Sequence, residues 1–151
     1  MQEKEQLMPS SRIALCTVYA AIALAALLAT WSQNLAYFHS PADFIPALGA
    51  FLLDTKVTPA ARSITADIAL FFLAAAIFMV IEARKHGVRF VWAYIAGGLF
   101  VAISVTFPLF LIARELRLAA PDANHLRALD IAPLAAFAAL IVGLTVWIDL
   151  L

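Results

Sequence analysis

A single carboxylate inside an apolar stretch is the feature of this sequence that most clearly suggests chemistry. Asp67 lies about one helical turn inside an apolar run that begins near Ser63. An ionised carboxylate in a membrane span costs about 2.5–3.5 kcal/mol on insertion scales, so we expect it to face other helices and to have a partner. Arg62 and Arg114 are the candidate partners. Asp67 and its arginine partner have two interpretations. They form either a polar anchor or proton-handling group beside a cavity for a lipophilic ligand, or an ion pair that locks helix packing.

The composition of the chain places it in a membrane. Of its 151 residues, 65% are hydrophobic and 13% are charged, whereas soluble domains have about 45–50% apolar and 25% charged residues. The formal net charge is zero, so nothing in the charge balance indicates a nucleic-acid partner. The partners implied are the lipid bilayer, lipophilic molecules and other membrane proteins.

Hydropathy predicts an all-α fold, a bundle of four transmembrane helices. About 20 apolar residues are needed to cross the bilayer core as a helix. A polar N-terminal tail, 1–12, is followed by a single membrane domain, 13–151, with spans at about 13–36, 63–83, 88–113 and 131–150. The connection after His39 contains FIPALGAFLL, which is too apolar for free water. It predicts an interfacial or re-entrant helix between the first two spans, and an ordered loop is the alternative.

Four alternating crossings would bring scattered polar residues to one side of the membrane. The end of the first span, the start of the second and the end of the third share that side in such a topology. The predicted polar cluster, which either binds a ligand or is structural, is Gln33, Asn34, Arg62, Asp67, Ser104, Arg114 and Glu115.

Two rows of small residues predict close contacts between helices. In lipid, Gly and Ala at every fourth position let a neighbouring helix approach closely. One row is in the first span and one is in the fourth: Ala21, Ala25 and Ala29, and Ala135, Ala139 and Gly143. Pro108 predicts a kink in the third span.

Several kinds of chemistry are not supported by the residue pattern. Haem ligation needs histidines within spans, and His39, His86 and His125 all lie in connections. The sequence contains no usable metalloprotease, hydrolase or nucleotide-binding motif and no metal ligands at helical spacing. Glu82 and Arg84 are interpreted as charges that fix helix depth. We therefore predict no catalytic residues, no metal and no cofactor, with a bound lipid, quinone or carotenoid as the ligands that a membrane cavity would take.

Parts of the chain resemble a known family. The segments TADIALFFLAAAIFMVIEARKHGVRFVWAYI and ISVTFPLFLIARELRL resemble a bacterial family of small, four-span integral membrane proteins of unknown function. The resemblance extends from about Val18 to Leu118 and rests on Asp67, on Glu82-Ala83-Arg84, and on the Pro-Leu-Phe-Leu run before Arg114-Glu115. It implies a multi-pass protein of the bacterial inner (cytoplasmic) membrane and supplies no activity.

Two functions remain open at this stage. The first is a non-enzymatic accessory or structural subunit, packed in a larger membrane complex or a homo-oligomer. The second is a binder, carrier or enzyme for a quinone, carotenoid or lipid at the polar cluster around Asp67. Lysines and arginines divide evenly between the two sides of the predicted topology, and the compact ARKHGVR turn favours cytoplasmic N and C termini.

Overall fold

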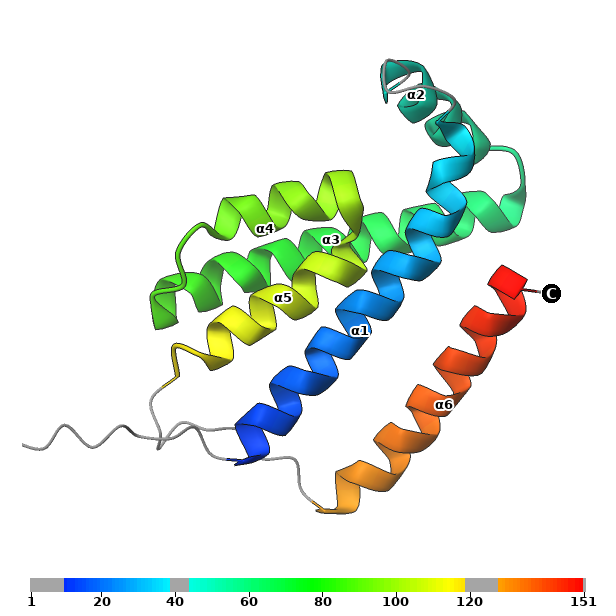
Figure 1. Cartoon of the computed structure of the whole chain (residues 1–151). Helices are drawn as coiled ribbons and strands as arrows, with labels where there is room; N and C mark the ends of the chain where they lie inside the picture. The colour runs from blue at the N-terminus through cyan, green and yellow to red at the C-terminus, as the bar shows by residue number, and fades with distance from the viewer. Residues whose placement is uncertain (1–9, 39–43, 119–127, 151) are drawn as a thin grey trace, which may run out of the picture.

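The computed structural model describes residues 10–38, 44–118 and 128–150, and every regular element in these ranges is a helix. In chain order they are α1 (Ser10–Asn34), η1 (Leu35–Tyr37), α2 (Phe44–Asp54), α3 (Pro59–His86), α4 (Val91–Gly97), η3 (Gly98–Ala102), α5 (Ile103–Glu115) and α6 (Ala128–Leu150). Four segments are long and apolar enough to cross a membrane: Ser10–Tyr37, Pro59–His86, Val91–Glu115 and Leu129–Ile148. The predicted all-α fold class is confirmed (Figure 1).

Helix α2 packs against η1, the short helix that follows α1. The Tyr37 hydroxyl donates a hydrogen bond to Asp54 Oδ2 at 2.7 Å, and the Tyr37 ring meets Phe51 edge to face. The segment after His39 therefore contains a helix, as predicted, and the alternative of an ordered loop is wrong.

Both ends of α3 have well-defined caps. The Thr58 hydroxyl accepts a hydrogen bond from the backbone N–H of Ala61, and Pro59 occupies the first turn, where its missing N–H costs nothing. Gly87 ends the helix in the left-handed conformation, with φ 68°. Glycine adopts this conformation without strain, so the chain can turn immediately toward α4.

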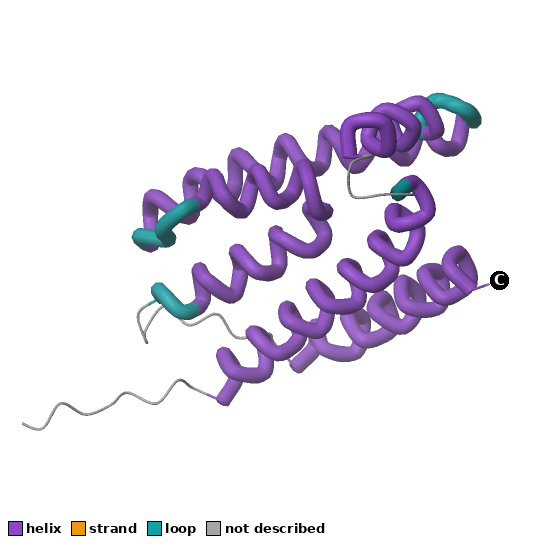
Figure 2. The backbone as a smooth tube through the Cα atoms, turned by 45° about the horizontal axis from the view of Figure 1, so that its top comes forward, coloured by secondary structure: helices purple, strands orange, loops and turns teal. Residues whose placement is uncertain are grey.

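The third apolar segment is folded back on itself at its middle. The rings of Tyr94 in α4 and Phe110 in α5 are 5.9 Å apart, whereas in a straight helix these residues would be about 24 Å apart. Figures 1 and 2 both show α4 leading away from the α3–α4 turn and α5 returning toward it. The path of this segment therefore differs from the predicted single crossing at about 88–113, although its length and composition suit a membrane.

Small residues at the bend explain why the segment folds back. Residues Gly98–Ala102 form a wide π-helical turn, and Ala102 then adopts an extended conformation (φ 176°, ψ 142°) that interrupts the helix. A Cβ on Gly98 would lie 2.8 Å from Phe72 Cζ, and one on Gly97 would lie 3.0 Å from Thr106 Cγ2. Glycine at these two positions therefore lets the bend pack against α3 and lets α4 pack against α5. The break occurs here rather than at Pro108.

The bend also needs a partner for its backbone, because an interrupted helix in a membrane leaves polar groups without intrahelical bonds. The indole N–H of Trp31 in α1 donates a hydrogen bond to the carbonyl oxygen of Val101 at 3.2 Å. The end of α1 therefore satisfies a carbonyl group at the bend.

The core lies where α3, α4 and α5 meet. Met79 and Phe110 are fully buried there, with Ala75, Ala83 and Val91 around them. Helix α1 packs along α5 and buries Arg12 and Ala23, whereas Ala21 and Ala25 of the predicted small-residue row remain exposed.

Helix α6 runs beside α1 in the same direction (Figures 1 and 2). We call the end of the molecule that holds Arg12, Glu82, Arg114 and Glu115 the Arg12 end, and the opposite end, which holds Asn34 and α2, the α2 end. Helices α1 and α6 both begin at the Arg12 end and finish toward the α2 end. The described ends of the chain, Ser10 and Leu150, therefore lie at opposite ends of the molecule, unlike the expectation that both termini share one side.

Candidate functional site

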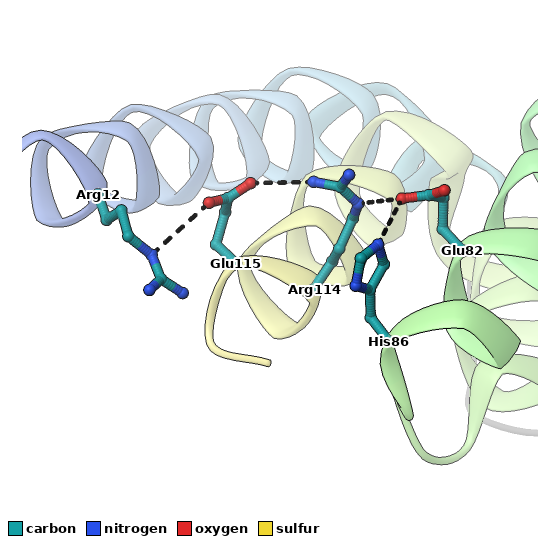
Figure 3. Close-up of polar contacts among 5 residues, drawn as sticks. All are labelled: Arg12, Glu82, His86, Arg114 and Glu115. Carbon is teal, nitrogen blue, oxygen red and sulfur yellow. Dashed lines mark hydrogen bonds and ion pairs between the residues drawn. The ribbon is translucent and has the colours of Figure 1, made fainter. Parts of the chain in front are cut away.

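A chain of five charged or ionisable side chains joins three helices at the Arg12 end (Figure 3). These residues, which we call the charge chain, are Arg12 from α1, Glu82 and His86 from α3, and Arg114 and Glu115 from α5. The fold-back at Ala102 is what places them together, because it returns the end of α5 to the end of α3.

Arg114 is at the centre of the charge chain. Its Nε donates a hydrogen bond to Glu82 Oε2, and its Nη1 donates one to Glu115 Oε1 at 3.1 Å. One guanidinium group thus joins carboxylates from two sources, its own helix and α3. Charge-assisted hydrogen bonds of this kind are stronger than neutral ones.

The two ends of the charge chain are more loosely joined. Arg12 Nε faces Glu115 Oε2 at 3.8 Å, and His86 Nε2 lies 3.3 Å from Glu82 Oε2, one helical turn away. Arg12 Nε, Glu115 Oε2 and His86 Nε2 are buried and have no hydrogen-bond partner among the residues that the structure describes.

Because these side chains are largely buried, their interactions affect the stability of the fold. Glu115 is 2% exposed and Arg12 is 5% exposed, and the side chains of Arg114 and Glu82 are 15% and 11% exposed. Taking one of these charges out of water costs several kcal/mol, and removal of its partner leaves that cost uncompensated. Two arginines balance two glutamates, so the cluster is neutral when His86 is neutral. The arrangement can fix how α1, α3 and α5 are aligned.

The fold separates the members of the predicted polar cluster. Arg114 and Glu115 lie at the Arg12 end and contact each other, whereas Gln33, Asn34, Arg62 and Asp67 lie on helix segments at the α2 end. The expectation that the end of the third segment shares a side with the end of the first is wrong, because the segment turns back at Ala102. Ser104 follows the bend and is exposed.

Asp67 does not have the partner that the sequence predicted. Its side chain is exposed, and it has no ion-pair partner among the residues described. Arg62, the nearer candidate, donates a hydrogen bond to the carbonyl oxygen of Lys56 at 2.8 Å, and Arg114 binds Glu82 and Glu115 instead.

Three members of the charge chain were missed as site residues: Arg12, Glu82 and His86. Glu82 was interpreted only as a charge that sets helix depth. The available signal was the Gly97-Gly98 pair in the middle of an apolar run, since adjacent glycines often mark a turn. A turn there would have predicted that Arg114 returns to the side of Glu82.

Metal binding has no support in residues 10–38, 44–118 and 128–150, where no group of three or more potential metal-ligating side chains occurs. The charged groups of the charge chain are bound to one another, which makes the charge chain suited to holding helices together.

Comparison with known proteins gives one match. A family model described as "Protein of unknown function DUF2834" matches residues 18–116. This agrees with the resemblance to an uncharacterised family over about the same residues. No curated protein and no solved structure matches the chain.

Proposed function

The chain belongs to the family of proteins of unknown function DUF2834, and we propose that it is a non-enzymatic structural membrane protein that assembles with a second copy of itself. The observation that carries this proposal is the exposed surface of α6. This helix of 23 residues has no buried side chain among those described, so its apolar surface is free for lipid or for another helix.

The row of small residues on α6 favours another helix. In the described part of the chain, nothing lies within 4 Å of the position that a Cβ on Gly143 would take, and Ala135 and Ala139, spaced four residues apart before it, are also exposed. Such a row lets two backbones approach closely in lipid. Among the described elements, α6 touches little besides α1, which leaves the row without a partner there.

A second copy is the simplest occupant of this face. Two identical rows related by a two-fold axis meet the same surface on each side, as in most homodimers. The sequence between Asp130 and Asp149 has no charged residue, so a partner that buries this face must itself be apolar. An apolar subunit of a larger membrane complex would satisfy the same requirement. Native mass spectrometry distinguishes such a complex from a homodimer by its mass.

The charge chain supports a structural role over a catalytic one. Arg114 uses two of its guanidinium nitrogens on Glu82 and Glu115, and Arg12 lies opposite Glu115. These groups are occupied with one another across α1, α3 and α5. The alternative of a quinone, carotenoid or lipid bound around Asp67 has no comparable support, because Asp67 is exposed and lies away from Arg114.

The folded-back segment favours one orientation in the membrane. It places Arg114 and Arg117 at the Arg12 end, which also holds the basic residues of the α3–α4 turn. Among the described residues, only the basic residues Lys56 and Arg62 lie at the α2 end. The bases at the Arg12 end are Arg12, Arg84, Lys85, Arg89, Arg114 and Arg117. By the positive-inside rule this end faces the cytoplasm, in the inner membrane of a bacterium, and the end of α6 faces the opposite side.

The experiment is native mass spectrometry of the protein extracted in a mild detergent. The proposal predicts a homodimer for the wild type, a monomer for Ala139→Leu, and a homodimer for the control Ala138→Leu. The control introduces the same bulk about a quarter turn away from the row. A wild-type monomer would contradict self-assembly. A stoichiometric complex with another subunit would show that this subunit, and not a second copy of the chain, covers α6.

A further inference from the structure

The turn between α3 and α4 contains an open hollow of about 480 Å³ that the proposed function does not use. Arg84, Gly87, Arg89, Phe90 and Trp92 are among the residues that line it. The turn follows α3, which is long and apolar enough to span a membrane, so the hollow lies near the boundary between lipid and water.

The hollow is positively charged. Arg84 and Arg89 are exposed, and neither has an ion-pair partner in the described part of the chain. No acidic residue occurs between Glu82 and Glu115, and both of these glutamates already bind Arg114. The two guanidinium groups are therefore free to bind an external anion.

Two large aromatic side chains lie beside these arginines. Phe90 is 80% exposed and Trp92 is 64% exposed. Phe90 adopts the left-handed conformation, with φ 60°, which is uncommon for a bulky residue. Tryptophan is enriched at the level of lipid head groups, where its ring meets both hydrocarbon and polar atoms. The hollow thus combines a site for an anion with a site for an acyl chain.

We propose that this hollow binds the phosphate group of an anionic phospholipid. The Arg84 and Arg89 side chains contact the phosphate oxygens, since the planar guanidinium group matches phosphate geometry. Phe90 and Trp92 lie against the upper part of the acyl chains. A phosphate without acyl chains would satisfy the arginines and leave the aromatic side chains exposed.

The test measures how much phosphatidylglycerol and phosphatidylcholine, with identical acyl chains, remain bound to the delipidated protein in native mass spectrometry. The wild type is expected to retain phosphatidylglycerol in preference to phosphatidylcholine. Each basic residue near an anionic membrane surface is worth about a fivefold change in binding, so Arg84→Gln/Arg89→Gln should weaken phosphatidylglycerol retention about 25-fold. Lys56→Gln, an exposed base at the α2 end, is the control and should leave retention unchanged.

Three results would overturn the proposal. The first is equal retention of the two lipids by the wild type. The second is undiminished phosphatidylglycerol retention by the double variant while its thermal unfolding matches the wild type. The third is displacement of the lipid by inorganic phosphate at equal concentration, which would make the hollow a site for free phosphate.

Discussion

Arg114 and Glu82 share a hydrogen bond although 32 positions separate them in the sequence. If the third apolar segment were a straight helix from Val91, Arg114 would lie about 35 Å along it from the start, at the far side of the membrane from Glu82. The contact exists because the segment turns back at Ala102. A straight third segment could not form this contact.

Loss of the Glu82 charge should destabilise the fold. Glu82→Gln leaves Arg114 with one carboxylate, and breaking a buried ion pair by removing one partner costs about 3 kcal/mol or more. Unfolding in SDS titrations of detergent-solubilised protein measures the change. Arg84→Gln, an exposed charge on the same helix, should stay within about 0.5 kcal/mol of the wild type.

A double-variant cycle tests whether Glu82 and Arg114 act as a pair. Glu82→Gln combined with Arg114→Gln should cost less than the sum of the two single changes, because neither charge is left alone. Simple additivity in the same titrations would mean that the two side chains do not interact.

A methyl group at Gly98 should disturb the bend. In Gly98→Ala the new Cβ would lie 2.8 Å from Phe72 Cζ, and overpacking of this kind costs about 1–3 kcal/mol. Thermal unfolding in detergent should therefore occur at a lower temperature. Phe72→Leu in the Gly98→Ala background should recover part of the loss, since it removes the ring.

The matched control for Gly98 is Gly49 in α2. Among the described residues, nothing lies within 4 Å of a Cβ at Gly49, so Gly49→Ala should leave the free energy of unfolding unchanged or raise it by up to about 1 kcal/mol through helix propensity. Equal effects at both glycines would show that space at the bend is not limiting.

Replacement of Trp31 tests the hydrogen bond to the bend. Trp31→Phe keeps an aromatic ring and removes the N–H that binds the Val101 carbonyl. Hydrogen bonds between membrane helices are worth about 0.6 kcal/mol on average and up to about 1.7 kcal/mol. The free energy of unfolding, measured by SDS titration, should therefore fall by about 1 kcal/mol. Hydrogen–deuterium exchange should also become faster at residues 98–106. Trp147→Phe, on the exposed face of α6, should leave hydrogen–deuterium exchange at residues 98–106 unchanged.

Hydropathy was sufficient to predict the four long apolar segments of this protein. The apolar runs and their lengths gave the all-α class and the positions of the long helices, and FIPALGAFLL gave α2. The caps of α3 were less visible: the helix begins at Pro59 rather than near Ser63, because Thr58 provides the N-cap. Patterns averaged over many residues were thus more reliable than individual boundaries.

The path of the third segment was not predictable from hydropathy, because a folded and a straight segment have the same composition. Gly97 and Gly98 were visible, but glycine in a span is equally consistent with close helix packing. Only the distances to Phe72 and Thr106 show that these glycines serve a turn. The error in the polar cluster followed from this one: Arg114 and Glu115 were assigned to the side of Asp67 because the segment was assumed to cross the membrane.

Cysteine labelling at three exposed positions tests the folded-back path most directly. Single cysteines at Lys56, Lys85 and Arg117, in a background with Cys16→Ala, would be treated in intact cells and in inverted vesicles with a maleimide that cannot cross the membrane. The fold-back predicts that positions 85 and 117 react from the same side, the cytoplasm, and position 56 from the other. Reaction of position 117 from the same side as position 56 would mean that the segment crosses the membrane, and the charge chain could not form.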